Sequence, residues 1–266
     1  MKRLIVNADD LGLSPNVNAG ILRGHRDGII TSASFISCGQ SAAEGARVAS
    51  ECPGLSVGVH LCLTRERPVL PPRELPTLAP HGKLPASPFV LVAKLSLGLI
   101  KESEVEMELF AQAERAVSLG VRPTHIDGHQ HVHVLPRVFS AALAVAKKHG
   151  VPAMRLPAGS FFLEYFSKRR KETLRAAGMK YPDFFFGLAE TGTLDAASLA
   201  SIIRALPEGT SELMCHPGTR DDLLAEASGW GMGWEADLSA VTDEGIRKLA
   251  ESEGVELISY RDMEVV

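Results

Sequence analysis

Short apolar runs alternate with longer amphipathic stretches along most of the chain. Seven runs have the length and aliphatic content of buried strands, at residues 4–7, 29–37, 55–61, 124–127, 153–156, 212–215 and 255–259. Apolar positions at helical spacing predict helices at about 17–27, 41–50, 102–119, 136–149, 195–205 and 242–253, with Pro136 in a first turn. This alternation predicts an α/β fold, a distorted TIM-like (β/α) barrel with about seven parallel strands.

Two segments interrupt the alternation and are predicted to be insertions. The first, at about 67–100, begins with closely spaced prolines, which cannot continue a helix or a strand interior. It ends in an apolar run from Phe89 to Ile100, shorter than the roughly 20 residues of a bilayer-spanning helix, so a buried helix is favoured over a lipid-binding groove. The second, at about 159–187, combines aromatic residues with a basic run at 168–171. This run is predicted to be a solvated helix face, with contact to an anion or a membrane surface as the alternative.

Length, charge and cysteine usage narrow the function classes. A chain of 266 residues is ordinary for one α/β barrel, so we expect a single domain over residues 1–266. The formal net charge of −4 gives no basic field for nucleic acid, which is not an expected partner. The four cysteines lack disulfide or metal-site spacing and are predicted to be reduced. The apolar run before Asp9 is too short for a signal peptide, so a cytoplasmic location is predicted, and a homodimer is left open.

Four histidines and an aspartate occupy alternate positions in one short stretch, at His125, Asp127, His129, His131 and His133. In an extended strand these side chains share one face, which is polar and suited to metal binding rather than to a packed core. The same extension separates the first and last histidines by roughly 26 Å, at about 3.3 Å per residue. One metal ion therefore cannot gather all of them.

Other polar residues stand at the ends of predicted strands, where barrel enzymes carry their catalytic groups. The first strand ends in Asp9 and Asp10, the third in His60 and the sixth in His216. Successive strand residues point in opposite directions, so the two aspartates are expected to differ in role, one binding a metal and the other acting as a general base. The alternative for these aspartates is a helix N-cap near Ser14. Imidazole and carboxylate ligands with an open position suit a catalytic zinc ion or a harder divalent ion such as magnesium.

The same positions resemble the YdjC-like carbohydrate deacetylase family, which is related to the polysaccharide deacetylases. The resemblance covers nearly the whole chain and rests on four motifs, which are NADDLG at 7–12, GVHL at 58–61, PTHID at 123–127 and MCHP at 214–217. It implies a polysaccharide-deacetylase-like barrel and a metal-dependent hydrolase that removes the acetyl group of an N-acetylated amino sugar. Residues 67–76 resemble the hopanoid biosynthesis-associated branch, which implies an N-acetylglucosaminyl hopanoid as one substrate.

Carried over residue by residue, the resemblance implies a role for each candidate. The metal ligands would be Asp10, His60 and His125. Asp9 would be the general base, and His216 would be the acid that protonates the leaving amine. The remaining residues of the histidine stretch would orient ligands or line the substrate pocket; they are Asp127, His129, His131 and His133.

Several alternatives are left open by the residues alone. Another metal-dependent barrel enzyme, such as a phosphoesterase or a sugar isomerase, would use the same type of site. A non-catalytic metal-binding or carbohydrate-binding protein would need the ligands but neither Asp9 nor His216. The substrate is expected to be either an N-acetylglucosamine-type oligosaccharide or a glycolipid. Trp230 and Trp234 are candidates both for stacking on a sugar ring and for ordinary packing.

Overall fold

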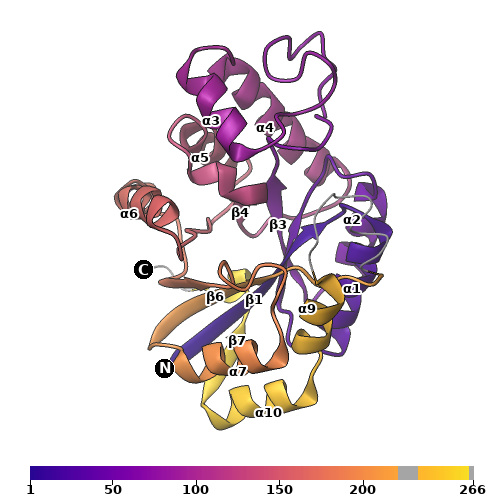
Figure 1. The fold of residues 1–266 in the computed structure, drawn as a ribbon, viewed down its shortest axis with the longest axis vertical. Helices are drawn as coiled ribbons and strands as arrows, with labels where there is room; N and C mark the ends of the chain where they lie inside the picture. Colours follow the sequence, from indigo (N-terminus) through magenta and orange to yellow (C-terminus); the bar gives the residue numbers. More distant parts are fainter. Residues whose placement is uncertain (221–232, 264–266) are drawn as a thin grey trace.

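A curved parallel sheet forms the centre of the computed structural model, which describes residues 1–220 and 233–263 (Figure 1). Its strands are β1 (Lys2–Leu11), β2 (Ser32–Phe35), β3 (Ser56–Leu61), β4 (Ile126–Gly128), β5 (Phe184–Phe186), β6 (Gly209–Cys215) and β7 (Val255–Ile258). They lie in the order β4-β3-β2-β1-β6-β5, and β7 pairs with the first half of β1. Every strand pairing in the described residues is parallel. The predicted α/β fold, a distorted barrel of parallel strands, is confirmed.

Helices cover the outside of the sheet. They are α1 (Pro15–Arg26), α2 (Ala42–Glu51), α3 (Pro88–Ser96), α4 (Glu102–Ser118), α5 (Phe139–Lys148), α6 (Phe161–Ala176), α7 (Ala196–Ala205), α9 (Trp234–Val241) and α10 (Glu244–Ser252). Two 3-10 turns, η1 (His129–Val134) and η2 (Tyr260–Asp262), follow β4 and β7. The helix α1 packs on β1, α2 on β2 and α4 on β3, as expected when strand, helix and strand follow one another.

The fifth strand differs from the one expected at residues 153–156. Residues 153–156 form only isolated bridges, to β4 on one side and to Lys180 on the other. Pro152 and Pro157 flank this segment and have no N–H with which to extend a ladder. The bridges lead from β4 toward the chain that enters β5, so the sheet curls toward a closed barrel. The sequence pattern missed β5 because three consecutive phenylalanines show no alternation.

The helix after the histidine stretch begins later than expected. Pro136 lies in a turn, and α5 starts at Phe139, so the predicted helix start at residue 136 was wrong. The residue before a proline is restricted to extended conformations, and Leu135 is extended, with φ −63° and ψ 146°. The N–H groups of Val138 and Phe139 both donate to the carbonyl of Leu135, so a turn that contains the proline leads directly into α5.

The apolar run of the first insertion forms α3, which is only partly buried. Leu91 and Leu95 pack into the core, whereas Phe89 and Leu97 are largely exposed. The predicted buried helix is thus correct for one face only. Within the described residues, no helix combines the length and the apolar character needed to cross a bilayer.

The strand β1 divides the core and sets the position of the polar site. Leu4, Val6 and Ala8 join the main apolar cluster beneath the helices. Ile5 points the other way, into a second, smaller apolar cluster that includes Tyr260. By the alternation of a strand, the inward face of β1 then continues from Ile5 through residues 7 and 9, which are polar.

Candidate functional site

The carboxyl end of β1 is irregular, and the irregularity turns two adjacent aspartates toward one site. The pairing of β1 with β2 shifts register between Ala8 and Leu11, and Asp10 has a φ of 70°. This left-handed conformation is uncommon for residues with a Cβ, although aspartate adopts it more readily than most, and such residues cluster at functional sites. As a result, both Asp9 and Asp10 approach His60, in contrast to the opposite directions expected of a regular strand. Neither caps a helix, because Ser14 caps α1 itself.

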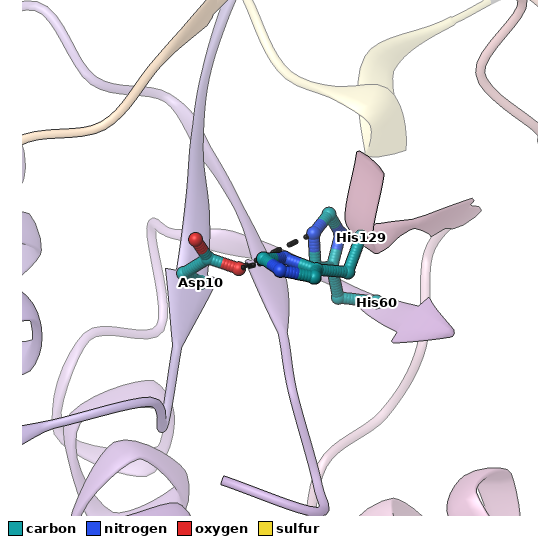
Figure 2. Close-up of side chains that lie close together, drawn as sticks. All are labelled: Asp10, His60 and His129. Carbon is teal, nitrogen blue, oxygen red and sulfur yellow. Dashed lines mark hydrogen bonds and ion pairs between the residues drawn. The ribbon is translucent and has the colours of Figure 1, made fainter. Parts of the chain in front are cut away.

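Three side chains from distant parts of the chain converge beside this strand end. Figure 2 shows Asp10 at the end of β1, His60 from β3 and His129 from η1. Oδ1 of Asp10 accepts a hydrogen bond from Nδ1 of His129 at 2.9 Å and lies 3.4 Å from Nε2 of His60. One ligand atom from each residue lies within 4.8 Å of the other two, and all three residues are buried. The three side chains together can hold a metal ion.

The histidine stretch reaches this site by turning rather than by extending. β4 ends at Gly128, and the backbone then folds into η1, with Gln130 and His131 both left-handed. The turn breaks the two-residue alternation and brings His129 back toward β1. The premise of an extended run over roughly 26 Å, at about 3.3 Å per residue, was therefore wrong. It is His129, not His125, that the structure brings to Asp10 and His60.

His125 lies deeper in the barrel and is packed as a core residue. Its ring stacks on Tyr260 with the centroids 3.8 Å apart, and its nitrogens hydrogen-bond Oγ of Ser34 and Oγ1 of Thr124. A Cβ added at Gly58 would lie 2.5 Å from the imidazole, so the glycine of β3 makes room for this ring. Burial lowers the pKa of His125 to about 3, which leaves the imidazole neutral. No metal-competent group in the described residues includes it.

Asp127 lies behind His60 and holds its ring. Nδ1 of His60 donates to Oδ1 of Asp127 at 2.9 Å, which leaves Nε2 facing the two aspartates of β1. Oγ of Ser34 donates to the other carboxylate oxygen at 2.6 Å. A carboxylate on the far nitrogen of a ligand histidine fixes the ring and increases its basicity. This contact fits the orienting role expected for Asp127.

Arg155 is a central residue of the site that the sequence analysis missed. It is fully buried and forms a paired contact with Asp9, Nη1 to Oδ2 and Nη2 to Oδ1, each at 2.7 Å. The same guanidinium reaches Asp127 at 2.9 Å and donates from Nε to Glu212 at 2.9 Å. Tyr260 in turn donates to Glu212 at 2.7 Å. The signal in the sequence was an arginine inside the apolar run 153–156, because a lone charge in a buried strand needs partners.

Negative charge dominates the buried site. Burial opposes ionisation of Asp9, yet the guanidinium of Arg155 holds its pKa below the usual value. Burial likewise opposes ionisation of Asp10, and His129 more than offsets it, so the Asp10 pKa is also lowered. Burial raises the pKa of Glu212 to about 6 despite Arg155. One guanidinium therefore faces several carboxylates, and further positive charge stabilises the site.

The two imidazoles beside Asp10, those of His60 and His129, supply positive charge by binding protons. Burial disfavours protonated His129, but the Asp10 carboxylate outweighs it and raises the His129 pKa to about 9. Burial also disfavours protonated His60, but Asp127 and Asp9 raise its pKa above the usual value. A divalent cation would replace these protons, because a metal ligand histidine binds in its neutral form.

The remaining candidates lie around this group. His216 follows β6, and its backbone N–H donates to Oδ2 of Asp237 at 2.8 Å; it is near enough to Asp10 to lower the Asp10 pKa. His131 is buried in edge-to-face contact with Phe185 at 5.7 Å, and within the described residues its Nδ1 has no hydrogen-bond partner. 

The two candidate tryptophans have different outcomes. Trp234 is buried at the start of α9, in the main apolar cluster, which matches the packing alternative. Trp230 lies outside the described residues.

Comparison with known proteins assigns the family. Residues 3–252 match the family model described as YdjC-like protein. A carbohydrate deacetylase of Geobacillus stearothermophilus is 34% identical over 260 residues, which cover 97% of this chain and 96% of that protein. A chitooligosaccharide deacetylase of Escherichia fergusonii is 30% identical, with 98% of each chain covered. The crystal structure of an Enterococcus faecalis V583 protein named for cellobiose-phosphate cleavage aligns with a TM-score of 0.83 at 27% identity, covering 97% of each chain. The chain therefore belongs to the YdjC-like protein family.

Proposed function

We propose that this protein is a divalent-metal-dependent hydrolase that removes the acetyl group from an N-acetylated amino sugar. The observation that carries the proposal is the convergence of Asp10, His60 and His129 at the ends of β1, β3 and β4. The carboxylate of Asp9 lies beside these three side chains. The names of the deacetylase relatives support the reaction type. We further propose that residues 1–266 act as one such domain, in the cytoplasm, with insertions at about 67–100 and 159–187.

The donor set favours Asp10, His60 and His129 as the metal ligands. A second group, formed by Asp9, His60 and Asp127, also has its donor atoms within 4.8 Å of one another. In that group, however, both carboxylates are already bound by Arg155. One carboxylate and two imidazoles, with an open position, suit zinc or another divalent ion such as magnesium in a catalytic site. We therefore propose His129 as the third ligand in the place first expected for His125.

The residues around the ligands fit the steps of amide hydrolysis. A bound divalent ion would polarise the acetyl carbonyl and stabilise the negative charge that develops on its oxygen. Asp9 accepts the proton of the attacking water as that water adds to the carbonyl carbon. Oδ2 of Asp9 lies 4.0 Å from Nε2 of His60 and so faces this centre, while Arg155 fixes the carboxylate. His216 donates a proton to the sugar nitrogen as the C–N bond breaks, which releases acetate and a free amino sugar.

The substrate proposal extends to one residue of the turn. Nδ1 of His131 is buried without a hydrogen-bond partner in the described part of the chain, and the residue is held at a φ of 57°. A polar atom kept unsatisfied in a costly conformation is typical of a group that contacts a ligand. We propose that His131 contacts the N-acetylglucosamine-type substrate. An oligosaccharide and a glycolipid, including an N-acetylglucosaminyl hopanoid, are the two substrate classes.

Acetate release is the test of this function. Protein loaded with zinc, manganese or magnesium is incubated with N-acetylglucosamine, with chitooligosaccharides and with an N-acetylglucosaminyl glycolipid. We expect acetate from at least one substrate, loss of release after treatment with a chelator, and recovery when metal is restored. Absence of release from every substrate by metal-loaded protein would contradict the proposal. Phosphate release from p-nitrophenyl phosphate under the same conditions would instead favour the phosphoesterase alternative.

Metal affinity is expected to depend on pH. The metal must displace a proton from His129, whose pKa is raised to about 9, and from His60, whose pKa is also raised. Below pH 9 the affinity should therefore fall by about tenfold per pH unit for the proton displaced from His129, and more steeply once the pH is below the raised pKa of His60. Calorimetric titration in buffers of different ionisation enthalpy measures both the affinity and the number of protons released. An affinity that is constant between pH 6 and 9 would contradict this ligand set.

A further inference from the structure

The helix α6 exposes a cluster of aromatic side chains at its amino end. Phe161 is 89% exposed, Phe162 50% and Tyr165 49%. With Lys168 and Arg169, which follow on the same outward side, these residues define what we call the α6 face. Exposed clusters of large apolar side chains are unusual on protein surfaces and mark sites that contact a membrane or another molecule.

Unpaired positive charge surrounds these aromatic residues. The helix carries five cationic and two acidic side chains. In the described residues, no carboxylate pairs with any of the five cations, which are Lys168, Arg169, Arg170, Lys171 and Arg175. Elsewhere on the surface such pairs are common, as between Lys148 and Glu114 or Arg137 and Glu102. Of the five cations, Lys168 and Arg169 are exposed on the α6 face, so their charge is available to an anionic partner.

The opposite side of α6 is anchored to the protein. Leu174 is buried in the core, and Oγ of Ser167 donates to the carbonyl of Pro157 at 2.7 Å. The guanidinium of Arg170 lies 4.5 Å from the ring centre of Phe139 in α5. The exposed aromatic residues therefore lie on the side of α6 that faces away from the protein. Figure 1 shows α6 at the side of the molecule.

Contacts within the α6 face keep an aromatic ring and a cation together. Nη1 of Arg169 donates to the hydroxyl of Tyr165 at 2.7 Å, and the guanidinium lies 4.9 Å from the ring centre. Aromatic rings beside basic side chains are the composition of helices that lie in a membrane interface. Rings of this kind occupy the depth of the lipid headgroups, where the cations meet lipid phosphates.

We infer that the α6 face binds the surface of an anionic lipid bilayer. Charge complementarity favours lipid over a second copy of the chain, because a two-fold interface through this face would bring the cations of both copies together. The helix contacts η1, which carries His129, so membrane binding would place the site next to the bilayer. If the site acts on a sugar, its substrate would then be an amino sugar carried on a lipid, and this consequence rests on the proposed deacetylase function. The membrane contact itself does not rest on that function.

Vesicle co-sedimentation tests the inference without using activity. The full chain is mixed with vesicles of phosphatidylcholine alone or of equal parts phosphatidylcholine and phosphatidylglycerol. We expect sedimentation with the anionic vesicles and release as salt is raised. The K168Q/R169Q variant should bind roughly 30-fold more weakly. The F161S/F162S variant should lose at least about tenfold, because its rings no longer enter the interface.

Matched controls separate this effect from misfolding and from general charge. R23Q/R47Q removes the same charge from α1 and α2 and should bind vesicles as the unmodified chain does. Acetate release from a soluble chitooligosaccharide should be unchanged in F161S/F162S, which also reports that the variant is folded. Failure of the unmodified chain to sediment with anionic vesicles at low salt would overturn the inference, as would equal binding by F161S/F162S. A dimer in light scattering that F161S/F162S converts to a monomer would assign the face to self-association instead.

Discussion

The Asp9→Asn variant is expected to lose about 10²- to 10⁴-fold in kcat while it still binds metal, because a general base contributes rate enhancement of that size. The amide keeps the shape of the side chain but cannot accept the proton of the attacking water. Arg155 retains Asp127 and Glu212 as charged partners in this variant, so the buried guanidinium is not left uncompensated. Measuring kcat by acetate release, and metal content by elemental analysis of the same sample, checks both parts of the expectation.

A control is available for the chemical change itself. Asp183 is an exposed aspartate just before β5, and Oδ2 accepts a hydrogen bond from the backbone N–H of Thr210, away from the candidate site. The Asp183→Asn variant should therefore keep full activity. Full activity in Asp9→Asn would remove Asp9 from the mechanism. Loss of metal together with activity in Asp9→Asn would instead indicate that Asp9 is a ligand.

His129→Asn is expected to lower zinc affinity by at least about 100-fold and to abolish activity at micromolar metal. Even the outer partners of ligand histidines alter affinity by about 10- to 100-fold, and a direct ligand should alter it more. The amide offers zinc no imidazole nitrogen, and Oδ1 of Asp10 loses the hydrogen bond that it accepts from Nδ1 of His129. Calorimetric titration with zinc gives the affinity, and acetate release gives the activity.

His125→Asn is the matched control, since it makes the same change at the other candidate ligand. It removes the stacking on Tyr260 and should lower thermal stability, but it should bind zinc with a stoichiometry near one. Thermal melts show which fraction of each variant is folded before the titrations are compared. Zinc binding that survives in His129→Asn and disappears in folded His125→Asn would reverse the proposed ligand assignment.

The parallel barrel could be predicted from the sequence because its strands are short apolar runs separated by amphipathic helices. The strands β1, β2, β3, β4, β6 and β7 all overlap predicted segments. The strand β5 could not be found in this way, since its three phenylalanines show no period and its role is to pair with β6. Likewise, residues 153–156 have strand composition, but the flanking prolines limit them to isolated bridges.

The members of the site at strand ends could be predicted from the sequence, but the third member of the group could not. Asp10 and His60 lie at strand ends and were identified from that position. The third member of the group depended on where the chain leaves β4, and the left-handed residues Gln130 and His131 that form the turn have no signature that the sequence analysis used. The resemblance implied His125 as the third ligand, whereas the turn brings His129 to Asp10 and His60.

The central position of Arg155 could not be predicted from the sequence. The acidic residues were evident, but their summed charge and its compensation depend on how closely the barrel brings Asp9, Asp127 and Glu212 together. A buried arginine with carboxylate partners on several strands is a property of the folded barrel. The only sequence signal was a charged residue within an apolar run, which is also compatible with an edge position.

The position of the metal tests the central claim most directly. A crystal of the protein soaked with manganese or zinc is measured at the absorption edge of that metal, and an anomalous difference map locates the ion. The account predicts one strong peak bonded to the carboxylate of Asp10 and to the imidazoles of His60 and His129, at about 2.0–2.2 Å for zinc. A peak bonded to His125, or no peak at this group in crystals of metal-dependent active protein, would contradict it.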